Sequence, residues 1–327
     1  MFAGPQGRKG WMAARLLLLA AVLFPPVAAA QAWPAKPVRM LVNLPPGTPP
    51  DQISRAISPR LGEVLGQPVV VENRVGASGM IALEAVARTA ADGYTLLYTP
   101  GFPVVIGVHL MKMPIDVTRD LEPVAPTARV ASFLVVRPSL PVKSVAEFVT
   151  YARANPGQLN YGSGGNGSQP HIAAEMFARA ANIRLTHIPY KGSTETLTAL
   201  LGGQVDFTFD VGVAIGQIKA GKLRLLAVAS PSRSSVFPDT PTMIEGGLEV
   251  NSSTIHGVYA PAGTPRDIVN RLNREIVRIM NGPELRTVLA GLAADLVTGT
   301  PQEFAEMQRR DREAFGAVVR EAGIRAD

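Results

Sequence analysis

The chain has 327 residues, of which 46% are hydrophobic and 18% charged, and it contains no cysteine. The absence of thiols excludes disulfides, cysteine nucleophiles and cysteine-based metal sites, and a chain of this length can bury a core without disulfides. Lysine and arginine total 32 against 26 acidic residues, a formal net charge of +6. The cations are not gathered into a stripe, so the charge does not indicate a nucleic-acid-binding protein.

The first thirty residues are typical of an export signal. Three cations precede or begin an uninterrupted apolar run at residues 16–24, and small residues follow at 28–30. This run is shorter than the roughly 20 residues that a transmembrane helix needs. We therefore predict a signal peptide at residues 1–30 and a periplasmic mature protein, with a retained N-terminal anchor as the alternative. Without the three cations the balance is 29 against 26, a net charge of +3.

Short apolar segments alternate with helix-like segments along the rest of the chain. The expected strands lie at residues 38–44, 68–73, 94–99, 133–138, 159–162, 184–190, 205–210, 223–230 and 257–261. The first helix is expected to begin near Asp51, and an amphipathic helix is expected at residues 265–280. Fully apolar strands that alternate with helices predict an α/β protein with mostly parallel sheets, covered by helices on both faces.

Local signals mark several helix ends. Thr264 before Pro265 predicts an N-cap with proline at the first helical position, and Ser144 before Glu147 predicts a capping box. Pro59 lies inside the first expected helix and should kink it or restart it.

The segment YGSGGNG at residues 161–167 contains the pattern G-x-G-x-x-G between an expected strand and an expected helix. A dinucleotide-binding turn also needs an acidic residue about 20 residues further on. The corresponding region has His187 and Lys191 and no acid before Glu195, so we expect neither NAD nor any other cofactor. The glycine-rich backbone at a helix N-terminus instead suits a small anion, either a carboxylate or a phosphate. An ordinary flexible loop is the alternative.

Three other expected strand-to-helix turns, at residues 45–51, 99–102 and 189–194, have a similar composition. Ligands of open parallel sheets bind beyond the carboxyl ends of the strands, so these turns predict one shared site.

No catalytic or metal-binding pattern accompanies these turns. The four histidines form no metal-binding motif, and Ser163 lacks the first glycine of a nucleophile elbow. The segment GQIKAGK at residues 216–222 leads from a helix into a strand, the reverse of a phosphate-binding loop. We therefore expect no enzyme activity and no metal site, and a hydrolase that uses Ser163 is the least favoured alternative.

Several motifs together resemble the Bug/TctC solute receptors of tripartite tricarboxylate transporters. In chain order they are VVVENRVGASG, ADGYTLL, YGSGGNGSQPHIAAEMF, HIPYKGSTETLTALLGGQVDFTFD, AGKLRLLAVASPSRSSVFPDTPTMIEGG and APAGTP. The resemblance implies a type II periplasmic-binding-protein (Venus-flytrap) fold, in which two α/β lobes close on a small carboxylate or dicarboxylate. We place lobe 1 at residues 36–131 plus 254–327 and lobe 2 at residues 132–253.

The resemblance also implies that the first loop and the glycine loop face each other across the cleft. With the other turns, the expected ligand-binding residues are Pro46, Gly47, Thr48, Asp51, Gly101, Tyr161, Ser163, Gly164, Asn166, Gly167, Ser168, Lys191 and Asp210. Asp210 matches the acid that ends a family strand and could accept a hydrogen bond from a ligand amino group. The chain departs from the family at Asn43, where proline is usual, at Thr48, where a second glycine is usual, and at Ile255, where tryptophan is common. These departures leave the identity of the ligand open.

The sequence thus predicts a monomeric receptor that hands an organic acid to the permease subunits of a membrane transporter. A periplasmic sensor that presents its ligand to a kinase ectodomain is the alternative. Permease genes beside the coding gene favour transport, and a histidine kinase gene favours sensing. No nucleic acid partner is expected.

Overall fold

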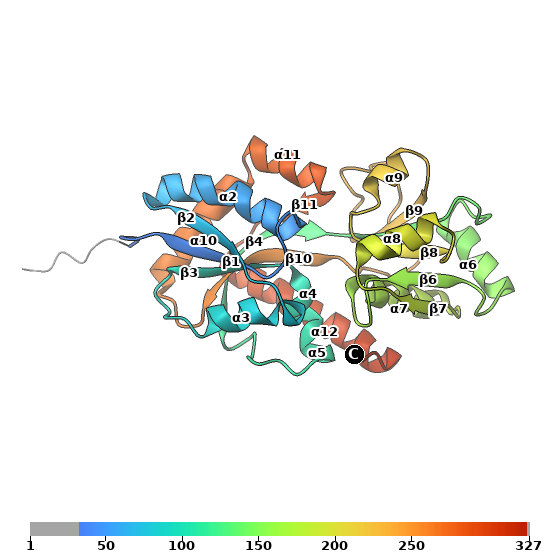
Figure 1. Ribbon diagram of the computed structural model, residues 1–327, viewed down its shortest axis with the longest axis horizontal. Helices are drawn as coiled ribbons and strands as arrows, with labels where there is room; N and C mark the ends of the chain where they lie inside the picture. The colour runs from blue at the N-terminus through green and yellow to red at the C-terminus, as the bar shows by residue number, and fades with distance from the viewer. Residues whose placement is uncertain (1–32, 326–327) are drawn as a thin grey trace, which may run out of the picture. The chain divides into compact units, whose positions relative to one another are not determined.

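The computed structural model describes residues 33–325, apart from the side chain of Ser78, and the predicted signal peptide lies outside this range. From residue 36 onward the described residues belong to one compact unit, which contains two separate β-sheets (Figure 1). No helix in the described part of the chain is long and apolar enough to cross a membrane.

The first sheet has six strands in the order β11-β4-β10-β3-β1-β2. They are β1 (Val38–Val42), β2 (Val69–Asn73), β3 (Thr95–Thr99), β4 (Leu121–Val130), β10 (Thr254–Pro261) and β11 (Ala294–Leu296). β1 runs parallel to β2 and β3, whereas β10 is antiparallel to both β3 and β4. The ends of β1, β3 and β4 therefore lie at the same edge of the sheet as the start of β10.

Helices cover both faces of the six-stranded sheet (Figure 1). One face carries α2 (Pro49–Leu65), α10 (Arg266–Met280) and α11 (Pro283–Gly291). The other carries η1 (Ala77–Gly79), α3 (Met80–Ala87), α4 (Gly101–Val105), α5 (Gly107–Leu110) and α12 (Pro301–Ala322). Gly257 of β10 lets α12 approach closely, because a Cβ atom there would lie 2.3 Å from the buried ring of Phe304.

The second sheet has five strands in the order β7-β6-β8-β5-β9. They are β5 (Ser132–Val136), β6 (Asn160–Ser163), β7 (Thr186–Pro189), β8 (Phe207–Asp210) and β9 (Arg224–Ala229). β6 is parallel to β7 and β8, and β5 is antiparallel to β8 and β9.

Successive side chains of β5 enter different cores, as the period of two in a strand requires. Leu134 packs in the core beneath α6 (Val145–Ala154) and α7 (Gln169–Ala181). Phe133 packs in the core beneath α8 (Ser193–Leu201) and α9 (Ile215–Lys219). This sheet is therefore also covered by helices on both faces.

The α/β class is confirmed, but the expectation of mostly parallel sheets is wrong. Among the described strands, two of five pairings in the first sheet and two of four in the second are parallel. β10 shows why an apolar composition did not predict strand direction. All its residues are buried, yet it is antiparallel to both neighbouring strands. Apolar composition reports burial on both faces of a sheet and carries no information on strand direction.

α2 continues through Pro59 as one helix, so of the two expected outcomes, a kink or a restart, the restart is wrong. Pro59 lies on the exposed side of the helix. Proline has no N–H to donate to the carbonyl of Arg55, four residues earlier, but water can bond that carbonyl on an exposed face.

The capping box predicted at Ser144 is only half formed. The Ser144 hydroxyl accepts a hydrogen bond from the Glu147 N–H at 3.1 Å, at the start of α6, but the Glu147 carboxylate accepts from the Lys143 N–H at 2.8 Å and not from Ser144. Thr264 does not cap α10, because its hydroxyl donates to the carbonyl of Pro261 at 2.7 Å and the helix begins two residues later.

The chain passes between the sheets at two places. Ala131 links β4 to β5, and residues 230–253 link β9 to β10 without a helix or a named strand. The longer link nevertheless buries Met243 and Val250, so it is part of the packed structure. That the two sheet units are lobes which close on a ligand remains a prediction.

Candidate ligand-binding site

A cavity of about 860 Å³ is lined by turns from both sheets. The six-stranded sheet contributes the loop after β1, residues of α4 and α5, and the start of β10, and the five-stranded sheet contributes the loops after β6, β7 and β8. The lining residues are Asn43, Leu44, Gly47, Thr48, Pro49, Pro50, Gln52, Pro100, Phe102, Pro103, Leu110, Met111, Val130, Gly164, Gly165, Asn166, Ser168, Gln169, Pro170, Ser193, Thr194, Val211, Gly212, Val213, His256, Gly291 and Leu292. Among the described residues this lining contains no aspartate, glutamate, lysine or arginine.

His256 adds no charge to the cavity. Its side chain is buried, and within residues 33–325 its Nδ1 atom has no hydrogen-bond partner. Burial lowers the pKa of His256 to about 3, so the ring is uncharged near neutral pH. An anionic ligand in this cavity must therefore be stabilised by neutral hydrogen-bond donors and by helix dipoles.

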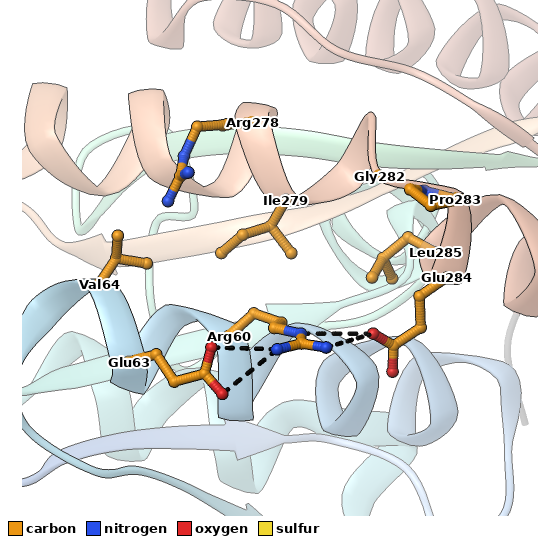
Figure 2. Close-up of a pocket in the computed structure, with 9 residues that line it drawn as sticks. All are labelled: Arg60, Glu63, Val64, Arg278, Ile279, Gly282, Pro283, Glu284 and Leu285. Carbon is orange, nitrogen blue, oxygen red and sulfur yellow. Dashed lines mark hydrogen bonds and ion pairs between the residues drawn. The ribbon is translucent and has the colours of Figure 1, made fainter.

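A second hollow, of about 550 Å³, lies between α2, α10 and α11 (Figure 2). Figure 2 shows Arg60 between two carboxylates, with distances of 3.2 Å to Glu63 and 3.4 Å to Glu284. The guanidinium is thus already compensated by two acids of the same surface. The hollow receives residues from one sheet unit only, so we assign the ligand site to the larger cavity. No group of three His, Asp or Glu side chains within residues 33–325 is arranged to hold a metal ion.

Asp51 holds the first loop from inside the protein. Its carboxylate accepts hydrogen bonds from the Gly47 N–H (2.9 Å), the Asn73 amide (2.8 Å) and the Arg55 guanidinium (3.0 Å). Burial by itself would raise the pKa of Asp51, but these three donors outweigh it and hold the pKa below its ordinary value. Asp51 is 3% exposed and lies outside the cavity lining, so it positions the loop.

The other predicted residues of the first loop divide between the cavity and the surface. Gly47 and Thr48 line the cavity, whereas Pro46 is exposed and lies outside the lining. Gly47 adopts a φ of +83°, a conformation that glycine accepts without strain.

A buried polar network supports the glycine loop. The Tyr161 hydroxyl donates to Glu175 at 2.7 Å, and the Gly167 N–H donates to Nδ1 of His171 at 2.9 Å. The rings of His171 and His187 stack with centroids 3.9 Å apart. Tyr161 and Gly167 are buried outside the lining, so the structure does not bring them to the cavity surface.

Ser163 belongs to the same support. Its hydroxyl lies 2.6 Å from Nε2 of His187 and accepts the Gly165 N–H at 3.1 Å. The pair has the spacing of a nucleophile and its base, but Ser163 is 0% exposed and lies outside the lining. This hydroxyl is not accessible from the cavity, so the geometry does not support a hydrolase that uses Ser163.

Two helices of the five-stranded sheet unit begin at the cavity. Ser168 is the N-cap residue of α7, and its buried hydroxyl has no hydrogen-bond partner in the described part of the chain. Ser193 and Thr194 begin α8, and both line the cavity, as do Gly164 and Asn166 from the glycine loop. The first N–H groups of a helix have no acceptor within the helix, and its dipole favours negative charge there. This side of the cavity therefore suits a carboxylate.

Asp210 does not face the cavity. It is 4% exposed, and its carboxylate accepts the N–H groups of Gly212 (2.7 Å) and Ala214 (3.1 Å) in the turn before α9. Burial raises the pKa of Asp210, although the backbone donors oppose the shift. This corrects the expectation that Asp210 is exposed to a ligand amino group.

Lys191 and Gly101 also lie outside the lining. The Lys191 side chain is exposed, and its backbone N–H donates to Glu195. Gly101 permits close packing of α4 on β10, because a Cβ atom there would lie 2.8 Å from Thr254.

The sequence did not single out the apolar wall of the cavity. Its members are Phe102, Leu110, Met111, Val213 and Leu292. Phe102 ends a turn that was predicted to face the site, whereas the others reach the cavity from α5 and from distant loops. Asn43 was noticed only as a departure from the family pattern, and no local signal marked His256.

Two α/β sheet units with a shared cavity and an uncharged lining define a solute-binding protein. Residues 53–324 match the model of the tripartite tricarboxylate transporter family receptor, TctC. The chain belongs to this family of receptors. BugT of Bordetella pertussis is 36% identical over 300 residues, which cover 90% of this chain and 92% of BugT.

Solved structures agree with this assignment. Rpa4515 of R. palustris, solved with adipate, has a TM-score of 0.78 and 34% identity, over 90% of this chain and 99% of that protein. MatC of Rhodopseudomonas palustris, solved with bound malate, has a TM-score of 0.74 and 31% identity, over 88% of this chain and 100% of MatC. The predicted family and fold are therefore confirmed.

Proposed function

We propose that this protein is a periplasmic receptor that captures a small organic acid in the 860 Å³ cavity and hands it to the permease subunits of a tripartite transporter. The observation that carries the proposal is the lining itself, which is uncharged and includes the starts of α7 and α8. Backbone dipoles attract an anion there without the cost of burying a cation. The adipate and malate held by Rpa4515 and MatC support this ligand class.

The proposed carboxylate contacts are the lining residues at that end of the cavity. They are Gly164, Asn166, Ser168, Ser193 and Thr194. The first loop, which belongs to the six-stranded-sheet unit, contributes Gly47 and Thr48 to the lining. A ligand that contacts both sheet units favours the conformation in which the two are close together. Binding and presentation to the permease are thereby coupled without any chemical step.

A thermal-shift screen of the purified protein tests the ligand class. The panel consists of mono-, di- and tricarboxylates, aromatic acids, amino acids and NAD, and hits are titrated by calorimetry. A ligand at 100 times its dissociation constant stabilises the folded state by about 2.7 kcal/mol, which is visible as a higher melting temperature. A shift with NAD and none with any acid would refute the proposal.

A cavity-filling variant tests the location of the site. Val213 lines the cavity and is 43% exposed, so Val213→Trp adds an indole there without disturbing a core. Val70 on β2 is equally exposed, at 45%, but lies outside the lining, and Val70→Trp is the matched control. We expect Val213→Trp to weaken acid binding at least tenfold and Val70→Trp to change it less than twofold. Equal effects of the two variants would exclude this cavity as the site.

Transport is tested by uptake. A strain without this receptor should lose high-affinity uptake of the acid that the screen identifies, and the wild-type gene should restore it. Normal uptake in that strain would contradict a role in transport while leaving the binding proposal intact.

A further inference from the structure

His171 lies against the glycine loop (residues 161–167) but outside the cavity lining. Gly164, Asn166 and Ser168 line the cavity, whereas the His171 side chain is buried behind them and does not. The Gly167 N–H, between these lining residues in the chain, donates to Nδ1 of His171 at 2.9 Å. Any effect of His171 on a bound acid must therefore act through the position of this loop.

The direction of this hydrogen bond fixes the form of the imidazole. A backbone N–H can only donate, so Nδ1 of His171 must carry a lone pair. A second proton on the ring would set two donors, the Gly167 N–H and Nδ1–H, against each other across 2.9 Å. The observed loop is thus compatible with an uncharged imidazole and incompatible with an imidazolium.

One acid and a second imidazole face His171. Nε2 of His171 lies 4.0 Å from Glu175, one turn further along α7. Glu175 also accepts the hydroxyl of Tyr161, from β6, at 2.7 Å. The ring of His187, from β7, stacks on the ring of His171 with centroids 3.9 Å apart. Two charged rings at this separation would repel each other, so the stack disfavours protonation of both.

Two charged groups on other elements packed against α7 already have partners. Glu321 of α12 forms an ion pair with Arg179, two turns along α7 from His171. The carboxylate of Asp210, from β8, accepts the Gly212 N–H at 2.7 Å. The proton balance behind the glycine loop therefore depends mainly on the two stacked histidines and Glu175.

The two histidines differ in how they tolerate a second proton. Nε2 of His187 lies 2.6 Å from the Ser163 hydroxyl, which is also 3.0 Å from the Gly165 carbonyl. A hydroxyl both donates and accepts, so it can accept from a charged His187 while it donates to the carbonyl. His171 has no such exchange, because its partner is the Gly167 N–H. Protonation of His171 therefore breaks a hydrogen bond to the loop, and protonation of His187 does not.

The loop can change shape when that hydrogen bond is lost. Gly165 and Gly167 have φ angles of +116° and +72°, and glycine moves between such conformations and others at low cost. A rotation of the Gly167 amide displaces Asn166 and Ser168, its neighbours in the chain, and both line the cavity.

We propose that His171 is a positioning residue that holds the glycine loop in its binding shape only while its imidazole is uncharged, so that protons and the organic acid compete for the protein. This inference rests on the proposed function and adds a pH dependence to the same site. The acid binds the loop that is held by uncharged His171, and the loop is released when His171 takes up a proton.

Calorimetry at pH 8 and pH 5.5 tests the competition with acids of the screen that bind, beginning with adipate, malate and benzoate. An imidazole ordinarily titrates near pH 6.5, so the affinity should be about fivefold lower at pH 5.5. Binding at pH 6 should release roughly half a proton, measured in buffers with different heats of ionisation. If acids bind equally at both pH values, this inference is overturned and the proposed function stands. If no acid binds at either pH, the proposed function fails.

Two substitutions of His171 separate its acceptor atom from its proton. Asparagine places Oδ1 where histidine has Nδ1, and an amide oxygen accepts a hydrogen bond without titrating in this range. We expect His171→Asn to match wild type within twofold at pH 8 and to lose the fivefold effect of pH. His171→Leu has no acceptor and should bind about fivefold more weakly than wild type at pH 8. The acid's own protons are the same in every variant, so the difference from wild type reports His171 alone.

The outcomes of these variants are decisive in both directions. A wild-type pH dependence in His171→Asn, or wild-type affinity of His171→Leu at pH 8, would overturn the inference. If His171→Asn binds no acid at any pH, the proton count of wild type decides, and binding at pH 6 without proton release would overturn it as well.

The remaining titrating groups supply matched controls. Nε2 of His109, on α5, lies 2.8 Å from the carbonyl of Arg312 and outside the lining. Glutamine can donate to the same carbonyl, so His109→Gln should keep the wild-type pH dependence of binding. Asp311 on α12 has a pKa raised to about 6 by burial, and Asp311→Asn should keep it too. A loss of pH dependence in either control equal to that in His171→Asn would contradict the assignment to His171.

Discussion

Replacing Asp51 by asparagine tests the conclusion that this acid positions the first loop rather than contacting the ligand. Asparagine has the same shape, but it has one acceptor oxygen where the carboxylate has two. In the structure both oxygens are used, one by the Gly47 N–H and the other by Asn73 and Arg55. At least one of these donors must therefore lose its partner in Asp51→Asn.

The expected loss of stability in Asp51→Asn follows from the number of hydrogen bonds that the charged carboxylate accepts. A hydrogen bond to a charged group contributes about 1.5–3 kcal/mol, and breaking a buried ion pair costs about 3–5 kcal/mol. Asparagine retains part of the network, and Arg55 is half exposed, so we expect Asp51→Asn to lower the free energy of unfolding by about 2–4 kcal/mol at pH 7.

The loss should depend on pH with a defined sign. The pKa of Asp51 is lower in the folded protein than its ordinary value of 3.8. Its contribution to stability is thus fully present above about pH 4 and is lost as the pH falls through the folded-state value. The difference between wild type and Asp51→Asn should therefore shrink in acid.

Thermal unfolding at pH 7 and at pH 3 measures both effects. At roughly 2–4 °C per kcal/mol for a chain of this size, the melting temperature of Asp51→Asn should fall by about 4–16 °C at pH 7. Asp239→Asn changes an exposed acid in the link between β9 and β10 and should leave the melting temperature unaltered. The reasoning is refuted if Asp51→Asn melts with wild type at pH 7, or if its deficit is the same at both pH values.

Three further substitutions, at Asp311, Gly257 and Lys191, have outcomes that can be predicted from the burial of each residue. Burial raises the pKa of Asp311 to about 6, so Asp311→Asn should raise the free energy of unfolding by about 1–3 kcal/mol above pH 7. Denaturation at several pH values should show this gain disappearing near pH 4, and a gain that persists there would contradict the assignment. Gly257→Ala places a Cβ atom 2.3 Å from the Phe304 ring and should lower the free energy of unfolding in urea by about 3 kcal/mol. Phe304→Leu in the same chain should recover part of this free energy. Full stability of the single variant Gly257→Ala would contradict the predicted clash. Lys191→Gln removes an exposed cation outside the cavity lining and should change acid affinity in calorimetry less than twofold; a tenfold loss would return Lys191 to the site.

The sequence was sufficient for the elements and the class of the protein. Strand β1 was expected at residues 38–44 and is found at Val38–Val42, where four of the five residues are apolar and buried, as expected of a strand covered on both faces. The loops that follow the strands were predicted to form one site, and Gly47, Thr48 and Gly164 do line a common cavity. Gly47 and Thr48 follow β1 of the six-stranded sheet and Gly164 follows β6 of the five-stranded sheet, so strand-end turns of two different sheets meet at this cavity; that the cavity binds a ligand remains a prediction.

The polar residues of those loops show where sequence reasoning ends. Asp51, Ser163 and Asp210 are residue types expected to contact a ligand. The side-chain oxygen atoms of each nevertheless form hydrogen bonds with other groups of the protein. A tight glycine-rich turn leaves backbone N–H groups without partners, and a neighbouring carboxylate or hydroxyl satisfies them as readily as it satisfies a ligand. Residue type is the same in both cases, and only the direction of the side chain differs.

By itself, therefore, the sequence determined that this chain is an α/β receptor of the tripartite tricarboxylate transporter family. Hydrophobic periodicity, glycine-rich turns and motifs are local properties, so they can be recognised from residues that are close together in the sequence. Tertiary structure alone decided the antiparallel direction of β10, the inward orientation of Asp51 and Asp210, and the placement of Asn43 and His256 on the cavity. These features depend on contacts between residues far apart in the chain, whose free energy no local pattern records.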